Sequence, residues 1–200
     1  DVGSTKSDIV EAALNTLGDK LHCFVPVHPI AGKEVAGVEH SDANLYKERA
    51  LIITPMASSG SQQVQLAKAI WQSLGSFITE LTPAAHDAAF AAVSHLPHVL
   101  SYAVIRGIFN QPNGAELISL GGPGFRDFSR IAASDPVVWR DILTTNREQV
   151  LLQIQHFKTA LNDFEQAIAT NDPTALEDMI RQASDLRHKW HIGAQQNSEE

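Results

Sequence analysis

The chain has 200 residues, of which 44% are apolar, enough to bury the core of one domain or of one and a half. Its formal net charge is −8 without any basic block, which argues against nucleic-acid binding because an acidic surface repels phosphate backbones. No apolar run approaches the roughly 18 residues of a membrane span, and the start lacks the basic and apolar pattern of a signal peptide, so we expect a cytoplasmic protein without a membrane or nucleic-acid partner.

The first third of the chain alternates helix-like and strand-like stretches. Apolar residues at helical spacing predict helices over 6–17 and 59–74. Short apolar runs rich in β-branched residues predict strands, which cover 22–27, 50–54 and 76–80. Strand, helix and strand at this density indicate parallel α/β packing. The single cysteine, Cys23, excludes an intramolecular disulfide, and its apolar surroundings predict a small buried hydrophobic residue.

From Thr82 onward the pattern becomes entirely helical. Thr82 and Pro83 are a cap-then-proline start for a long alanine-rich helix that runs towards Phe109. Pro97 inside this helix should kink or locally break it. The glycine-rich stretch 121–124 predicts a flexible break. Two further helices are predicted over 136–170 and 171–190, followed by a polar tail over 193–200.

The predicted helix over 136–170 carries an apolar seam that recurs every three or four residues. The seam consists of Val150, Ile154, Phe157, Leu161, Phe164 and Ile168. A helix of this length extends for about 50 Å, too far for a compact monomer to cover one seam throughout. We interpret the seam as core or dimer interface, and we expect a two-fold homodimer through the helical part.

His28 begins the stretch His-Pro-Ile-Ala-Gly-Lys-Glu-Val-Ala-Gly, a rigid turn that follows an apolar run. A neutral imidazole near pH 7 suits the removal of a hydroxyl proton while hydride leaves an alcohol carbon. The alternative is a turn histidine that caps a strand end. Ser4, in Asp-Val-Gly-Ser-Thr-Lys, has a similar alternative, because a serine before Lys6 can N-cap the first helix.

Two arginines four positions apart, Arg126 and Arg130, lie in Gly-Phe-Arg-Asp-Phe-Ser-Arg-Ile-Ala-Ala-Ser-Asp-Pro (124–136) and share one face if this segment is helical. Arg130 is the better carboxylate ligand, since a planar guanidinium can hold a carboxylate by two parallel hydrogen bonds. A titratable base and a cationic cluster suit an enzyme that acts on a small, multiply anionic substrate.

The stretch Ser94-His95-Leu96-Pro97-His98 sets two histidines one helical turn apart. This spacing could suit a metal, but no carboxylate or cysteine accompanies the pair at ligand spacing, so we expect no metal site. Both histidines could instead satisfy backbone groups freed by Pro97, an interpretation that we favour for His95. Trp139 is interpreted as a packing residue at a pocket wall, and a place in the core is the alternative that we favour.

No G-x-G-x-x-G motif opens a βα unit in this sequence, and the glycines at 121–124 follow no predicted strand. That motif supplies most contacts to the pyrophosphate of a dinucleotide. We therefore expect the 200-residue chain alone to have negligible affinity for NAD and no measurable dehydrogenase activity.

These motifs make the chain resemble the prephenate and arogenate dehydrogenases of tyrosine biosynthesis, and the resemblance spans nearly the whole chain. It implies an α/β part followed by an all-α part, that is, a partial Rossmann-type sheet and then a helical dimerisation domain of the hydroxyacid-dehydrogenase-like kind. Residues 1–81 would form the C-terminal part of a dinucleotide-binding Rossmann domain, 82–192 the helical substrate-binding and dimerisation domain, and 193–200 the polar tail. A family member would carry the glycine-rich turn before Asp1.

The resemblance also implies roles for individual residues. His28 would accept a hydrogen bond from the ring hydroxyl of the substrate, and Ser4, beside the nicotinamide, would orient His28 and that hydroxyl. Ser94 and His98 would face the substrate, and Arg130 would bind its carboxylate. A local ion network beside the substrate would comprise Glu34, Arg126 and Asp127.

The implied reaction is the oxidative decarboxylation of prephenate, or of arogenate, to 4-hydroxyphenylpyruvate or tyrosine, with reduction of NAD or NADP. Two alternatives stay open. The chain could be an inactive dimerisation and substrate-side fragment of such an enzyme, or part of another hydroxyacid dehydrogenase.

Overall fold

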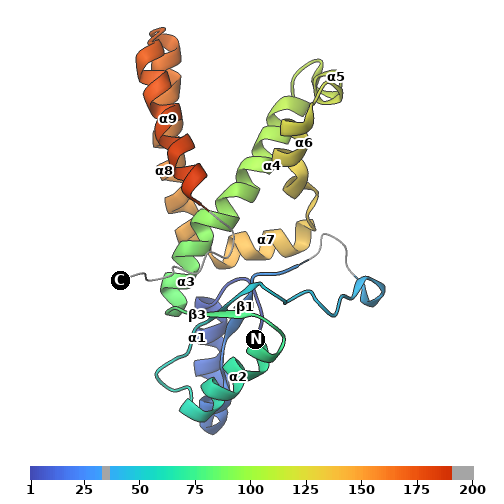
Figure 1. Ribbon diagram of the computed structural model, residues 1–200, viewed down its shortest axis with the longest axis vertical. Helices are drawn as coiled ribbons and strands as arrows, with labels where there is room; N and C mark the ends of the chain where they lie inside the picture. Colours follow the sequence, from blue (N-terminus) through green and yellow to red (C-terminus); the bar gives the residue numbers. More distant parts are fainter. Residues whose placement is uncertain (33–36, 191–200) are drawn as a thin grey trace. The chain divides into compact units, whose positions relative to one another are not determined.

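The structure, a computed structural model, describes residues 1–32 and 37–190. It divides into two compact units, 1–151 and 152–200, and the division falls inside a long helix. The order of the elements along the chain can be followed in Figure 1. Glu34, which the sequence analysis assigns to the ion network, lies outside the described residues.

A three-stranded sheet in the order β1-β2-β3 lies in the first unit. β1 (Val27–Pro29) runs antiparallel to β2 (Ala50–Ile53), and β2 runs parallel to β3 (Phe77–Glu80). Parallel strands need a crossover connection, which α2 (Ser61–Ser73) supplies between β2 and β3. The described residues between β1 and β2 form only the short 3-10 helix η2 (Val38–His40). The predicted parallel packing is therefore confirmed for β2 and β3 and wrong for β1.

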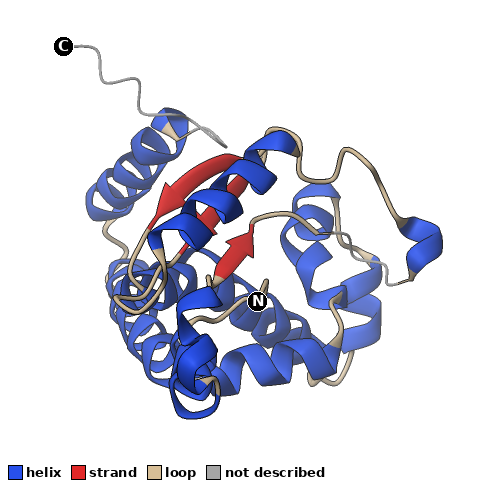
Figure 2. Ribbon diagram, turned by 90° about the horizontal axis from the view of Figure 1, so that it is seen from below, coloured by secondary structure: helices blue, strands red, loops and turns tan. Residues whose placement is uncertain are grey.

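The core of this α/β part is apolar and involves all three strands. Buried Val27, Leu51 and Ile53 form its centre, against which Val25, Val64, Ala67, Trp71 and Ile78 pack. α1 (Ser7–Thr16) confirms the helix predicted over 6–17. Figure 1 shows α1 and α2 on the same side of the sheet, and Figure 2 views the strands from that side. Because α2 supplies Val64, Ala67 and Trp71 to the core, it covers this face of the small sheet.

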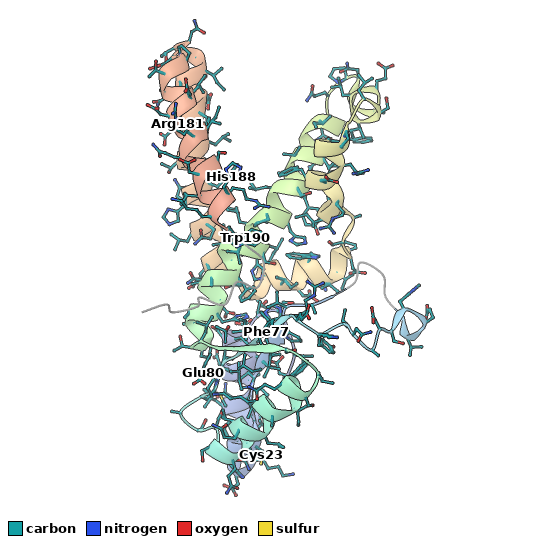
Figure 3. The ribbon with its side chains drawn as sticks, in the orientation of Figure 1. Cys23, Phe77, Glu80, Arg181, His188 and Trp190 are labelled. Carbon is teal, nitrogen blue, oxygen red and sulfur yellow. The ribbon has the colours of Figure 1, made fainter. Side chains whose placement is uncertain are left out.

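The strand predicted over 22–27 is wrong over most of its length. Residues Gly18–Cys23 form a 3-10 helix, η1, and only the last residue of the predicted strand reaches β1. The backbone N–H of Gly60 donates to the carbonyl of His22 over 2.8 Å, so a loop engages this segment in place of a neighbouring strand. Cys23 is exposed, and the prediction that it is buried is wrong. Figure 3 shows Cys23 at the outer end of the α/β part.

A continuous helix covers Pro83–Phe109. Its parts are α3 (Pro83–Phe90), the π-helical turn η3 (Ala91–His95) and α4 (Leu96–Phe109). The hydroxyl of Thr82 accepts a hydrogen bond from the N–H of Ala85 over 3.1 Å, which confirms the predicted cap. Pro97 has no N–H, and in a regular helix its ring clashes with the carbonyl four residues earlier. The wider π turn directly before Pro97 is the local break that the sequence predicts.

Among the described residues, Pro83–Phe109 is the one helix whose length and composition would allow it to cross a membrane. An interior helix of a globular protein meets the same criterion. This helix buries His86, Asp87 and His95, all of which are hydrogen-bonded to other groups of the fold. Such groups are costly in hydrocarbon unless they are paired inside the fold, as these three are.

Several shorter elements follow. They are α5 (Gly114–Ser119), α6 (Pro123–Ser129), η4 (Arg130–Ala133) and α7 (Pro136–Thr145). The carboxylate of Asp135 accepts hydrogen bonds from the N–H groups of Val137 and Val138 over 2.8 and 2.9 Å, so this helix starts where the sequence predicts. The single helix predicted over 136–170 is wrong, because the chain breaks at Asn146 (φ −101°, ψ 31°) and α8 (Arg147–Ala169) starts after it.

The second unit consists, over its described part, of residues 152–169 of α8 and of α9 (Pro173–Lys189). The carboxylate of Asp172 caps α9 by accepting from the N–H of Ala175 over 3.0 Å. The exposed apolar side chains of this unit are Leu152, Leu161, Ile168, Ile180, Leu186 and Trp190. Trp190 lies at the end of α9, with Arg181 and His188 along the same helix (Figure 3). Much of the apolar surface of α8 and α9 is therefore uncovered within one chain.

Candidate active site

His28 lies in the middle of β1, opposite Ile52 of β2. Its Nδ1 is 2.8 Å from Nε2 of His86, which α3 presents to the strand. The ring of His28 also contacts the ring of Phe90, with 4.8 Å between their centroids. Strand and helix together therefore fix the position of this imidazole.

His86 connects His28 to a buried carboxylate. Nδ1 of His86 is 2.8 Å from Oδ1 of Asp87, and the side chain of His86 is fully buried. The ring of His86 stacks on Phe90, with centroids 4.5 Å apart and an interplanar angle of 25°. The result is a hydrogen-bonded chain of three side chains, His28, His86 and Asp87, which we call the His28 relay.

Asp87 also caps α1. Its two oxygens accept hydrogen bonds from the backbone N–H groups of Lys6 and Ser7, each over 2.8 Å. Burial acts to raise the pKa of Asp87, but the hydrogen bonds from His86, Ser7 and Lys6 together outweigh it and lower the pKa to about 2. Asp87 is therefore ionised, and it takes the capping role that the sequence analysis left open for Ser4.

Lys6 ties the start of the chain to β1. Its buried ammonium donates to the carbonyl of Val27 over 2.8 Å and pairs with the carboxylate of Asp1. Burial lowers the pKa of Lys6 to about 8, against the opposing effect of Asp87. Ser4 is half-buried in this segment, and its hydroxyl has no hydrogen bond to another described residue, His28 included.

The environment of His28 keeps its ring neutral. Burial lowers the pKa of His28 to about 3, and the nearby His86, Lys6 and His95 add to this effect, while Asp87 opposes it. At neutral pH the imidazole is therefore uncharged and can accept a hydrogen bond. A pKa this low makes the ring a weaker proton acceptor than the base that the sequence predicts.

A second cluster surrounds Trp139 of α7. His98 stacks on Trp139, with ring centroids 3.4 Å apart and planes at 19°, and His95 meets the same indole edge-on at 6.1 Å. Nδ1 of His98 donates to the carbonyl of Ser94 over 2.9 Å, which leaves its Nε2 for other partners. The backbone-binding role that we favoured for His95 thus belongs to His98. Trp139 also lines a cavity of about 520 Å³ with Tyr102, and this agrees with its predicted place at a pocket wall.

Asn146, at the break between α7 and α8, joins the two clusters. Its side-chain Nδ2 donates to the backbone carbonyl of Asp87 over 2.8 Å and lies 3.1 Å from Nδ1 of His95. Burial lowers the pKa of His95 to about 4, against the opposing effect of Asp87. A neutral His95 can accept the hydrogen bond from Asn146, so the clusters share one polar interior.

The arginine segment is more exposed than these clusters. α6 ends at Ser129, so Arg126 lies in the helix and Arg130 in the 3-10 turn η4 after it. Arg126 donates from Nε to a carboxylate oxygen of Asp127 over 3.1 Å, and their side chains are 75% and 71% exposed. The two form a pair at the surface of the chain. Residues 126–129 are helical, and Arg130 is the C-cap of α6 and the first residue of η4.

The sequence analysis missed the interior half of the site. His86, Asp87 and Asn146 carry no motif, and their role depends on packing between segments that are distant along the chain. The only local signal is a histidine followed by an aspartate in the first turns of a capped helix. Within 1–32 and 37–190, no group of three or more histidine, cysteine, aspartate or glutamate side chains could hold a metal ion.

The chain is similar to known proteins over almost its whole length. The model of the prephenate dehydrogenase nucleotide-binding domain matches residues 1–80, and the model of the prephenate dehydrogenase dimerization domain matches residues 82–182. The cyclohexadienyl dehydrogenase of Zymomonas mobilis is 31% identical over 94% of this chain and 64% of its own length. The prephenate dehydrogenase of Bacillus subtilis is 29% identical over 94% of this chain and 50% of its own length.

Solved structures of prephenate and arogenate dehydrogenases also resemble this chain over almost its whole length. The prephenate dehydrogenase of A. aeolicus, in complex with hydroxyphenyl propionate and NAD⁺, has a TM-score of 0.87 and 36% identity, over 94% of this chain and 65% of that one. The arogenate dehydrogenase of Synechocystis has a TM-score of 0.80 and 28% identity, over 96% and 68%. The chain thus spans between half and about two thirds of the length of these relatives. The fold they share is a nucleotide-binding domain of Rossmann type followed by a helical dimerisation domain.

Proposed function

Because this chain belongs to the prephenate dehydrogenase family, we propose that the protein is a cytoplasmic enzyme that converts prephenate to 4-hydroxyphenylpyruvate by oxidative decarboxylation, with reduction of NAD or NADP. Arogenate, which would yield tyrosine, is the alternative substrate, and the likeness to cyclohexadienyl and arogenate dehydrogenases favours testing it. Either product serves tyrosine biosynthesis.

The observation that carries this proposal is the state of His28. Its ring is partly buried, its Nδ1 is held by His86 over 2.8 Å, and its pKa is lowered to about 3. A fixed and neutral imidazole is suited to accept a hydrogen bond from a substrate hydroxyl at neutral pH. A turn histidine that only capped a strand end would need neither a buried relay nor a neutral ring.

The chemistry requires such an acceptor. As hydride leaves the ring carbon that bears the hydroxyl, this carbon loses an electron pair and the hydroxyl proton becomes strongly acidic. The bond between the opposite ring carbon and its carboxylate breaks, carbon dioxide leaves, and the electron pair of this bond makes the ring aromatic. The hydrogen bond to His28 strengthens as the hydroxyl becomes acidic, so it stabilises the transition state more than the bound substrate. The phenol product keeps the proton.

The segment 1–6 supports a nicotinamide beside His28. The N–H of Val27 donates to the carbonyl of Asp1 over 3.2 Å, and Lys6 donates to the carbonyl of Val27, so both ends of this segment are bonded to the first residue of β1. Ser4 lies between these two contacts with a hydroxyl that no other described residue engages. It would orient the substrate hydroxyl and the amide of the cofactor, which when bound supplies the hydride acceptor.

The substrate carries carboxylates that the chain must bind. Arg130 would hold one of them through its guanidinium, and Ser94 and His98 would face the ring from α4 and the turn before it. His98 is supported in this role by its stack on Trp139 and by its Nε2, which no other described residue engages. Glu34, Arg126 and Asp127 would form the ion network around this pocket.

We also propose that the protein is a homodimer through its helical part. The match of residues 82–182 to a dimerization domain supports this assembly. So do the exposed leucines and isoleucines of α8 and α9, which would leave a large apolar patch in water unless another chain covers them. An obligate two-fold interface of this kind buries on the order of 2,000 Å² or more.

The test is turnover by the full-length protein. Incubated with prephenate and NAD or NADP, it should release NADH or NADPH, carbon dioxide and 4-hydroxyphenylpyruvate in equal amounts, and arogenate in place of prephenate should give tyrosine. A reduced cofactor without carbon dioxide, or turnover of a different hydroxyacid alone, would assign the protein to another hydroxyacid dehydrogenase activity. Cofactor binding without turnover of any of these acids would contradict the proposal.

A further inference from the structure

His28 has two ring nitrogens, and only one of them can face a substrate. Nδ1 is occupied by the hydrogen bond to His86, so Nε2 is the atom left for the hydroxyl. Nε2 can accept a hydrogen bond only if the proton of the neutral ring is on Nδ1. The reaction in the proposed function therefore depends on which tautomer His28 adopts, and the partners of Nδ1 decide it.

The chain of donors and acceptors begins at Asp87. Its carboxylate oxygens receive the backbone N–H groups of Lys6 and Ser7, which can only donate. The carboxylate is itself only an acceptor while it is ionised, so the atom of His86 that faces it, Nδ1, must carry a proton. A backbone cap thus fixes the charge of Asp87, and Asp87 fixes the proton on His86.

The second link depends on the charge of His86. If His86 is neutral, its proton is on Nδ1 and its Nε2 accepts from Nδ1–H of His28, which leaves Nε2 of His28 as an acceptor. If His86 were doubly protonated, Nδ1 of His28 would have to accept and Nε2 would carry the proton. The carboxylate of Asp87 requires one proton on His86, which the neutral ring supplies, and full burial disfavours a second one, so we take the neutral form.

We propose that Asp87 and His86 are positioning residues that hold His28 in the tautomer with its proton on Nδ1, so that Nε2 of His28 receives the hydrogen bond from the substrate. This inference rests on the proposed function for the identity of the substrate, but the tautomer itself is a property of the protein without substrate. Neither residue touches the reacting atoms; both act through His28.

The first experiment is nitrogen NMR on the full-length protein labelled with ¹⁵N-histidine. The shifts and couplings of His28 should identify a ring protonated at Nδ1 at neutral pH, and those of His86 a ring protonated at Nδ1 and bare at Nε2. Loss of one histidine signal set in His28→Asn and in His86→Gln assigns the two residues. A proton on Nε2 of His28, or a doubly protonated His86, would overturn the inference whatever the activity.

The second experiment separates positioning from folding by rescue. His86→Leu removes the acceptor for Nδ1–H of His28 and should lower kcat for prephenate by roughly 10²-fold or more with a smaller change in KM. His86→Gln keeps an oxygen that can accept the same hydrogen bond and should recover at least tenfold of that loss. His22→Gln is the matched control, because the exposed side chain of His22 bonds only the carbonyl of Asp19 and the thiol of Cys23.

A third variant addresses the carboxylate. Asp87→Asn has nearly the same shape but puts an NH₂ group against either a backbone N–H or His86. If the amide donates to Nδ1 of His86, the proton of His86 moves to Nε2 and the tautomer of His28 reverses, so both the NMR signature and kcat should change together.

Equal kcat in His86→Leu and His86→Gln, or an Asp87→Asn enzyme with a reversed tautomer and unchanged kcat, would overturn the positioning role. Wild-type inactivity towards prephenate and arogenate would defeat the proposed function while the NMR result still decides the tautomer.

Discussion

Asn146 donates a hydrogen bond from its side-chain amide to the backbone carbonyl of Asp87 over 2.8 Å, across 59 positions of the chain. The same amide nitrogen lies 3.1 Å from Nδ1 of His95. All three groups are buried, so the break between α7 and α8 is connected directly to the residue that anchors the His28 relay.

Replacement of Asn146 should therefore destabilise the fold. Asn146→Ala leaves the buried ring nitrogen of His95 without its donor and removes one of two donors to the Asp87 carbonyl, which also accepts from the backbone N–H of Ala91. The free energy of unfolding should fall by about 1–3 kcal/mol. Urea unfolding followed by circular dichroism measures the change. Asn162→Ala, at an exposed position of α8, is the control and should shift stability by less than about 0.5 kcal/mol. Equal effects of the two changes would contradict the importance of this contact.

Arg130 should act on substrate binding rather than on the chemical step. If its guanidinium holds a carboxylate, Arg130→Ala should raise KM by one to two orders of magnitude, about 1.5–3 kcal/mol for a charged hydrogen bond. The value of kcat should fall less, because hydride leaves from a different part of the ring. Steady-state kinetics of the full-length protein measure both constants. Arg130→Lys keeps the charge but lacks the planar guanidinium, so its KM should lie between those of the wild type and Arg130→Ala. An unaltered KM in Arg130→Ala would assign this residue to the ion network alone.

Acid should destabilise the fold earlier than the carboxylates alone would. The folded pKa values of His28 and His95 are lowered to about 3 and about 4 from 6.5, so between these limits the unfolded chain binds more protons than the folded one. Stability should thus fall as pH decreases below about 6.5, by up to about 1.4 kcal/mol per pH unit for each histidine. Asp87 has a folded pKa of about 2, so its contribution to stability is lost only as the pH falls below 3.8, its ordinary pKa. Unfolding midpoints measured from pH 7 to pH 4 test this prediction. His28→Gln should make the dependence of stability on pH less steep. A wild-type stability that did not change over this range would contradict the buried neutral histidines.

The homodimer should depend on the apolar side chains of α8. Phe157→Asp puts a charge into the seam and should give monomers or insoluble protein if the seam is the interface. Light scattering of the full-length protein at micromolar concentration gives the mass directly. Thr159→Asp changes the charge of α8 equally at an exposed polar position and should remain a dimer. A wild-type protein with the mass of one chain would exclude the dimer.

Local chemistry made part of this fold predictable. Thr82, Asp135 and Asp172 each precede a proline, and all three side chains cap the helix that starts there. The strands over 50–54 and 76–80 were predictable for the same reason, since short β-branched runs between turn residues have few other structures. The match of pattern and structure holds where the determining residues are neighbours in sequence.

Elements whose structure depends on contacts between distant residues were not predictable from the sequence. The apolar run that starts at residue 22 predicts a strand. In the structure the carbonyl of His22 accepts a hydrogen bond from the N–H of Gly60, and none of the described strands pairs with residues 22–26. The helix over 136–170 reads as continuous, but Asn146 leaves helical geometry and directs its amide to Asp87 and His95. His28 could be proposed from its motif and the resemblance of that motif to a known family. His86 and Asp87, on a helix that starts 55 positions later, could not, because their contact with His28 depends on packing.

The most direct test of the account is the kinetics of His28→Asn in the full-length protein, with prephenate and its preferred cofactor. Because the imidazole is required as the hydroxyl becomes acidic and less for holding the bound substrate, kcat should fall by roughly two to four orders of magnitude while KM changes little. Circular dichroism and the mass of the assembly should match the wild type, since asparagine is smaller and polar at a half-buried position. A folded His28→Asn enzyme that retained most of its kcat would contradict the assignment of His28 as the acceptor for the substrate hydroxyl.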